Sequence, residues 1–156
     1  AVRSLAAPAD ENIVYNFHCY EPLIFTHQGG YWVDGMPEDF RMALHKTVDE
    51  IKKLTKKYLP NNEIMLEPVK QEECFFEQFF ADALAVAEER NVPLYCGEYG
   101  VINLASTEDT LQWYQAISEV FDRYHIGRAA WSYKEMDFGI VDAHMEDVRE
   151  KVIACL

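Results

Sequence analysis

Three short apolar runs that alternate with long amphipathic stretches constrain the fold of this chain more than any other feature. The runs, 12–18, 92–97 and 127–131, are rich in β-branched or aromatic residues and bounded by polar ones, which predicts buried strands. Longer patterns with helical spacing lie between and after them. Strands that alternate with helices form a parallel sheet with crossover helices, so the sequence predicts an α/β fold.

Four helices are expected from periodicity and from residues that favour helix ends. The first would span 37–58, because Pro37 and the two acidic residues after it suit a helix N-terminus. The second would span about 72–90 and carry an apolar stripe. The third would follow Ser106 as its N-cap, and the last would span about 143–155.

The predicted sheet is too small to close on itself. A closed barrel of parallel strands needs about eight strands and roughly 250 residues, whereas this chain has 156 residues and three predicted strands. A three-stranded parallel sheet leaves two hydrogen-bonding edges open, which favours pairing with another chain or self-association. We therefore expect residues 1–156 to form a single domain that is part of a larger barrel.

Composition excludes several classes of partner. The net charge is −13, with 27 acidic against 14 basic residues, which argues against nucleic acid. No run of 18 apolar residues is present, so no membrane partner is expected. The four cysteines lack CxxC spacing and metal-type pairing with histidine, so free thiols and neither metal nor cofactor are expected. Without an initiator Met or an apolar leader, secreted and cytoplasmic locations both stay open.

Functional side chains gather at the predicted C-terminal ends of the strands, where parallel α/β proteins place their sites. Residues two apart on a strand share a face, which groups His18 with Tyr20 and Cys96 with Glu98. If those faces and that of Trp131 point into one barrel mouth, a carboxylate, a phenol, an imidazole and an indole converge. Each also has an ordinary structural interpretation: a strand-end glutamate as a cap, and the others as core residues.

Four stretches, taken together, resemble glycoside hydrolase family 5, the large cellulase-like family. Residues 12–22 resemble its sixth strand and 25–30 (Phe-Thr-His-Gln-Gly-Gly) the loop that follows. Residues 92–100, which contain Cys-Gly-Glu-Tyr-Gly, resemble the seventh strand, and 129–134 (Ala-Ala-Trp-Ser-Tyr-Lys) the eighth. The resemblance implies that this chain is the C-terminal portion of a (β/α)8 (TIM) barrel. It also implies a glycosidase that cleaves β-linked glycans, such as β-glucan or cellulose, with retention of configuration.

The resemblance gives a role to each matched residue. Glu98 would be the nucleophile that forms the glycosyl-enzyme, and Tyr20 would donate a hydrogen bond that keeps this carboxylate ionised and aimed. His18 would lie beside the sugar and tune the acid/base carboxylate. Trp131 would form the stacking floor of the reacting subsite, with a cis peptide bond to Ser132.

Two further residues are candidates for substrate binding. Trp32 follows the loop after the sixth strand and would stack on a distal sugar or pack within the loop. Lys134 would reach a sugar hydroxyl, or pair with Glu135 or Asp137. The expected partner of this site is a polysaccharide or oligosaccharide substrate.

A second carboxylate is missing. Retaining hydrolysis uses two carboxyl groups about 5–5.5 Å apart, and the family takes its acid/base from an Asn-Glu pair after the fourth strand. Here Asn62-Glu63 lies in a linker, Glu21 should point off the inner face, and Glu135 and Asp137 lie on the wrong side for leaving-group protonation. We therefore expect the chain alone to be inactive, or nearly so, until the N-terminal half of the barrel is supplied.

Two alternatives stay open at this point. In the first, the chain is a non-catalytic carbohydrate-binding half-barrel that keeps Trp131 and Trp32 as a sugar platform. In the second, it is a metal-dependent enzyme whose ligands would be His18, His27 and Cys96, although these residues lack metal-type spacing.

Overall fold

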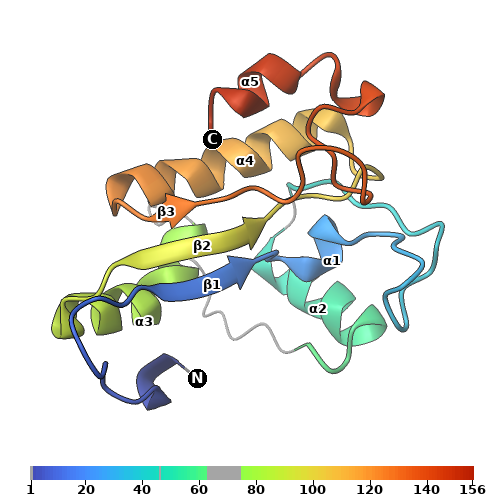
Figure 1. The fold of residues 1–156 in the computed structure, drawn as a ribbon. Coiled ribbons are helices and arrows are strands. Elements are labelled where there is room, and N and C mark those ends of the chain that lie inside the picture. Colours follow the sequence, from blue (N-terminus) through green and yellow to red (C-terminus); the bar gives the residue numbers. More distant parts are fainter. Residues whose placement is uncertain (1, 46, 63–74) are drawn as a thin grey trace.

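The computed structural model describes residues 2–45, 47–62 and 75–156. The described chain forms one parallel sheet of three strands in the order β1-β2-β3, with helices between them (Figure 1), which confirms the predicted α/β class. In chain order the elements are η1 (Val2–Ser4), β1 (Tyr15–Cys19), α1 (Leu23–Thr26), α2 (Val48–Tyr58), α3 (Phe75–Arg90), β2 (Leu94–Tyr99), α4 (Thr107–Arg123), β3 (Gly127–Arg128), η2 (Ala143–Met145) and α5 (Arg149–Ile153).

The third strand is shorter than the expected 127–131, but its pairing with β2 continues past its end. The amide of Ala129 donates to the carbonyl of Cys96, and the amide of Trp131 donates to that of Tyr99, both at 2.9 Å. These bonds keep Trp131 beside the C-terminal end of β2. The chain after β3 therefore reaches the same edge of the sheet as the ends of β1 and β2.

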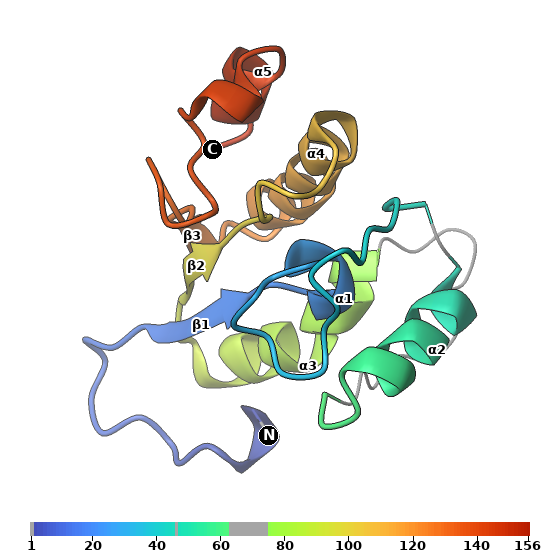
Figure 2. The same ribbon diagram turned by 90° about the vertical axis from the view of Figure 1, so that its right-hand side faces the viewer.

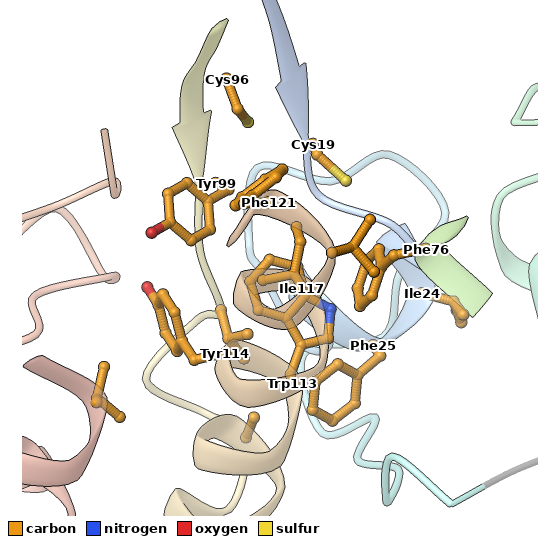
Figure 3. Packing of buried hydrophobic residues seen from close by; sticks show 14 of the residues in the cluster. Cys19, Ile24, Phe25, Phe76, Cys96, Tyr99, Trp113, Tyr114, Ile117 and Phe121 are labelled. Carbon is orange, nitrogen blue, oxygen red and sulfur yellow. The ribbon is translucent and has the colours of Figure 1, made fainter. Parts of the chain in front are cut away.

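Helices α3 and α4 lie on the same side of the sheet (Figure 2) and bury one of its faces. The ring of Phe80 in α3 lies 5.3 Å from Phe17 of β1 and 5.7 Å from Phe121 of α4. Tyr99 of β2 lies 5.2 Å from Phe121, and Trp113 of α4 is buried beside it (Figure 3). The apolar stripe predicted for the helix over about 72–90 therefore packs into the core, together with the apolar face of α4.

The opposite face of the sheet is not covered by any helix of the described residues. Asn16, His18 and Ala129 are exposed there, and Tyr95 and Trp131 keep 38% and 37% of their surface in contact with solvent. In a closed (β/α)8 barrel this face would point to the interior, where side chains from all strands pack in layers. The exposed inner face is what an incomplete barrel would show, and so are the outer edges of β1 and β3, which pair with no further strand among the described residues.

A bulge in β2 changes which residues share a face. Phe17 pairs with Cys96, but the next pair is His18 with Glu98, so Gly97 is passed over. Cys96 therefore faces the helices and is fully buried, whereas Glu98 lies on the inner face beside His18. The expected grouping of Cys96 with Glu98 is wrong, because an inserted residue reverses strand alternation. A Cβ at Gly97 would lie 2.6 Å from the Asn16 side-chain oxygen, which favours glycine at this position.

The helix expected over 37–58 begins only at Val48. Thr47 is its N-cap, and the structure shows a full capping box: the Glu50 amide donates to the Thr47 hydroxyl oxygen, and the Thr47 amide donates to the Glu50 carboxylate. Upstream, the buried amide oxygen of Gln28 accepts the amide of Met42 at 2.8 Å. That contact holds the preceding segment as a loop, so a proline with two acids was a misleading start signal.

We expect Thr47→Ala to lower the free energy of unfolding by about 1 kcal/mol, because the cap satisfies an amide that α2 itself leaves without a partner. Chemical denaturation followed by circular dichroism measures the change. Thr47→Ser is the matched control, since it keeps the hydroxyl. An equal loss in both variants would show that the threonine methyl, rather than the cap, carries the effect.

The C-terminal helix expected over 143–155 is two short pieces, η2 and α5. Between them the backbone of Val148 leaves helical geometry, with φ −121° and ψ −5°, and its amide bonds to the carbonyl of Met145, three residues back. The expected start of α3 at Glu72 lies outside the described residues. Among the described residues, the cysteines are free and no helix is long and apolar enough to cross a bilayer.

Candidate active site

The carboxylate of Glu98 lies between two side chains from the end of β1. The Tyr20 hydroxyl donates to Glu98 Oε2 at 3.0 Å, and His18 Nδ1 lies 3.4 Å from the same oxygen. The bulge at Gly97 aligns these groups, because it brings Glu98 directly opposite His18 in the strand register. The side chain of Glu98 is 34% exposed, so its carboxylate is both held by protein and open to a ligand.

Tyr20 is a fixed hydrogen-bond donor. Its burial, together with the hydrogen bond to the Glu98 carboxylate and the charge of that group, raises the pKa of the phenol well above its usual range. The phenol therefore keeps its proton near neutral pH. As a neutral donor, the hydroxyl can hold one oxygen of the Glu98 carboxylate in place without placing a second negative charge beside it.

An aromatic cluster supports Tyr20 from the side of the loop after β1. The His27 ring meets the Tyr20 ring edge-on, with centroids 5.0 Å apart, and Phe138 lies 5.8 Å from Tyr20 and 5.2 Å from His27. Trp32 lies 6.3 Å from both His27 and Phe138 and is 44% exposed. Burial lowers the pKa of His27 to about 4, so its imidazole is neutral near neutral pH.

Two of the candidate binding residues extend the site beyond β3. Trp131 is part of the inner face, and its peptide bond to Ser132 is cis, as expected from the resemblance. Lys134 lies in the loop that follows, largely exposed, with its amine 4.0 Å from a carboxylate oxygen of Glu135. The described contacts join Trp32 to the cluster around Tyr20, but they do not bring Lys134 to Glu98.

A hollow of about 550 Å³ opens beside this cluster. The residues that line it come from the end of β1, the loop before α2 and the turn after α2: His18, Tyr20, Glu21, Leu23, Asp34, Gly35, Leu59, Pro60, Asn61 and Asn62. A larger hollow of about 990 Å³ lies at the opposite end of β2, between α3 and the end of α4. Only the smaller one adjoins the groups that hold Glu98.

Glu21 directly follows Tyr20 in the chain, and its carboxylate already accepts a backbone hydrogen bond. Its Oε2 accepts the amide of Leu23 at 3.1 Å, at the start of α1, and its backbone carbonyl accepts the indole N–H of Trp113 at 3.0 Å. Burial raises the pKa of Glu21 above its ordinary value. The structure thus uses Glu21 to join β1 to α1 and α4.

Three residues of this site were not assigned a role in sugar chemistry from the sequence: Thr26, His27 and Phe138. Thr26 and His27 lie in the Phe-Thr-His-Gln-Gly-Gly stretch that resembles the loop after the sixth strand of the family. That motif is the sequence feature that could have pointed to them. Cys96, a ligand in the metal alternative, faces the helices, on the opposite side of the sheet from His18. Among the described residues, no three His, Cys, Asp or Glu side chains are grouped closely enough to hold a metal ion.

Comparisons with known proteins identify the family and the fold. The family described as Cellulase (glycosyl hydrolase family 5) matches residues 1–137. Cellodextrinase A of Ruminococcus flavefaciens is 39% identical over 81% of this chain and 31% of its own length. Endoglucanase C of Acetivibrio thermocellus is 32% identical over 99% of this chain and 46% of its own length. The chain therefore spans less than half the length of each relative.

Solved structures show the same fold at lower identity. The endoglucanase Cel5A of Thermotoga maritima superposes on the whole chain with a TM-score of 0.68 and 20% identity, and 43% of its own length is covered. The cellulose synthase subunit Z of Clostridioides difficile superposes on 97% of the chain with a TM-score of 0.67, 24% identity and 44% of its length covered.

Proposed function

Because this chain belongs to glycosyl hydrolase family 5, the cellulase family, we propose that it is the nucleophile-bearing part of a barrel that hydrolyses β-linked glucans with retention of configuration. The observation that carries the proposal is the Glu98 carboxylate, held by the Tyr20 hydroxyl and beside His18 at the ends of two paired strands. An ionised carboxylate that is fixed yet partly exposed is what a glycosidase nucleophile requires.

The hydrogen bond from Tyr20 assigns separate roles to the two carboxylate oxygens. It engages Oε2, so we assign Oε1 to the attack on the anomeric carbon. A bond then forms between Oε1 and that carbon while the bond from the carbon to the leaving oxygen breaks, and the acid/base carboxyl group donates its proton to the leaving oxygen. Water completes the reaction. The acid/base carboxylate, now deprotonated, takes a proton from the water, whose oxygen bonds to the anomeric carbon while the bond from that carbon to Glu98 breaks. Two inversions at one carbon give retention.

The other site residues have roles that follow from where they lie. Trp131 is on the inner face next to the end of β2, where its ring can underlie the sugar that reacts at Glu98. Trp32 lies at the outer side of the aromatic cluster and is suited to stack on a sugar farther along the chain. Lys134 reaches from an exposed loop and is suited to a sugar hydroxyl. His18, beside the carboxylate, contacts the sugar and the acid/base.

The acid/base group belongs, in this proposal, to the N-terminal half of the barrel. Of the described carboxylates near the site, Glu21 is engaged at α1 and Glu135 is an exposed loop residue, so neither is suited to the role. The chain covers less than half of each relative, and no further strand of the described part pairs with the outer edges of β1 and β3. The partner that fits these edges is a set of parallel strands with helices on their outer side.

We expect the isolated chain to release no sugar from cello-oligosaccharides at the turnover numbers of about 1–10³ s⁻¹ that intact enzymes reach. Reducing-sugar release is the assay, and an aryl β-cellobioside with an activated leaving group tests the nucleophile with less need for protonation. Turnover in that range by the isolated chain would contradict the proposal.

The matching positive experiment fuses the chain behind the first five strand–helix units of the Ruminococcus flavefaciens cellodextrinase, and we call this fusion the completed barrel. It should hydrolyse both substrates, because it restores the second carboxylate. The substrate class follows the relatives' names, cellodextrinase and endoglucanase, so soluble cello-oligosaccharides are the first substrates to test. The Thermotoga Cel5A has been solved in complex with cellobiose and with mannotriose, so manno-oligosaccharides belong in the same series.

A further inference from the structure

We propose that Thr26 is the positioning residue of this site, because its hydroxyl and carbonyl together fix Tyr20 against Glu98. This inference rests on the proposed role of Glu98 and goes beyond it to a residue that does not touch the substrate. Thr26 is the last residue of α1 and is fully buried. Its two oxygen atoms, the hydroxyl Oγ1 and the backbone carbonyl oxygen, form hydrogen bonds to different parts of the site.

The first contact is made by the hydroxyl group. Thr26 Oγ1 donates to the backbone carbonyl of Tyr20, and the same oxygen lies 3.0 Å from Nδ1 of His27. His27 is the ring that packs edge-on against Tyr20. One oxygen atom therefore holds both the backbone of Tyr20 and a ring that supports its side chain.

Proton counting fixes the form of His27. A threonine hydroxyl has one hydrogen, and the Tyr20 carbonyl can only accept, so that hydrogen goes to Tyr20. Thr26 Oγ1 must then accept from His27, and the hydrogen of the neutral imidazole is on Nδ1. Free histidine in water favours the other tautomer, with the hydrogen on Nε2. The tautomer of His27 thus reports directly whether the Thr26 hydroxyl is in place.

The second contact is made by the Thr26 carbonyl. It accepts the amide of Ile102 at 2.9 Å, and Ile102 is buried in the segment that follows Glu98 and the end of β2. Through its two oxygens, Thr26 is bonded to the chain at both strand ends that carry the catalytic pair. The Tyr20 to Glu98 hydrogen bond of 3.0 Å joins the same two strand ends a short distance away.

Removal of the hydroxyl would release both groups at once. The Tyr20 carbonyl and His27 Nδ1 would lose a buried partner, and a buried polar group without a partner is costly. The loop would move to satisfy them, and the aim of the Tyr20 hydroxyl at Glu98 would change. A displacement of the order of 1 Å in a positioning group can cost about 10²-fold in rate.

The test compares Thr26→Val, which removes the hydroxyl at nearly constant shape, with Thr26→Ser, which keeps it. The control is Thr55→Val, because Thr55 is also buried and its hydroxyl has no hydrogen-bond partner among the described residues. In the isolated chain, two-bond ¹H–¹⁵N spectra of the histidine rings identify the tautomers, with His27 assigned by a His27→Asn variant. We expect Nδ1–H in the wild type, Thr26→Ser and Thr55→Val, and Nε2–H in Thr26→Val.

In the completed barrel, we expect Thr26→Val to lower kcat on the aryl cellobioside by about 10-fold with KM within about twofold, while Thr26→Ser and Thr55→Val stay near wild type. An unchanged His27 tautomer in Thr26→Val, or an equal kcat loss in Thr55→Val, would overturn the proposal. If the completed barrel is itself inactive, the proposed function fails. The tautomer of His27 still decides whether Thr26 holds the loop as described.

Discussion

Glu98→Gln in the completed barrel should lower kcat on an activated aryl β-cellobioside by about 10³-fold or more and leave the affinity for cello-oligosaccharides within a few-fold. The amide keeps the size and the contact with Tyr20 but has no charge with which to attack the anomeric carbon. Steady-state kinetics gives kcat, and calorimetric titration gives the affinity. Glu89→Gln, on the exposed surface of α3, is the matched control and should behave as wild type.

A chemical rescue sharpens this result. Azide added to Glu98→Ala can occupy the space of the missing carboxylate and attack the anomeric carbon, which would give a glycosyl azide of inverted configuration. An acid/base residue would instead give the retained product, since the covalent intermediate still forms. Retained stereochemistry, or wild-type kcat in Glu98→Gln, would remove Glu98 from the role of nucleophile. A completed barrel that binds sugar without any turnover would favour the non-catalytic alternative.

The free energy of unfolding of the chain should fall as the pH is lowered from about 7 to about 4, with His27 contributing up to roughly 3 kcal/mol of the loss. Burial lowers the pKa of His27 to about 4 in the folded protein, against an ordinary value near 6.5 in the unfolded chain. Between these values the unfolded chain binds a proton and the folded protein does not, so acid favours unfolding. Above about pH 7 the ring is neutral in both states, and its ionisation has no effect on stability.

The contribution of His27 is isolated by difference. Urea denaturation at a series of pH values is compared between wild type and His27→Asn, in which the amide N–H₂ can still donate to Thr26 but cannot titrate. The difference between the two curves should be flat above pH 7 and change steadily toward pH 4. His125→Asn is the control, because His125 is exposed and its positive φ of 54° suits asparagine. Parallel curves for wild type and His27→Asn would show that the ring titrates normally in the folded state.

Local patterns were sufficient for much of the fold. Short apolar runs that alternate with helical stripes predicted a parallel sheet, and β1, β2 and β3 lie in that arrangement. The capped start of α4 was also predicted: Ser106 accepts the amide of Asp109 as an N-cap. These features depend on residues within a few positions of each other, so they can be predicted from local patterns in the sequence.

Strand parity failed at Gly97 because a bulge is a property of two strands. Gly97 within the strand is a local sign of a bulge, but the sequence does not show that His18 pairs with Glu98 after Phe17 has paired with Cys96. Glu98 was nevertheless correctly expected on the same face as His18, because two errors cancelled. The first error placed Glu98 on the face of Cys96, and the second took that face to be the inner one. The start of α2 failed for a related reason, since Gln28 fixes the segment before it from a distance.

By itself, the sequence determined the α/β class, the family and the set of residues expected around Glu98, because these follow from periodicity and from short motifs. Only the tertiary structure decided how those residues are arranged. The inner-face position of Glu98 requires the pairing of β1 with β2. The lowered pKa of His27 requires burial in a cluster where Tyr20, Trp32 and Phe138 meet. The role of Thr26 requires two strand ends within reach of one residue, and no local pattern encodes contacts between segments far apart in the chain.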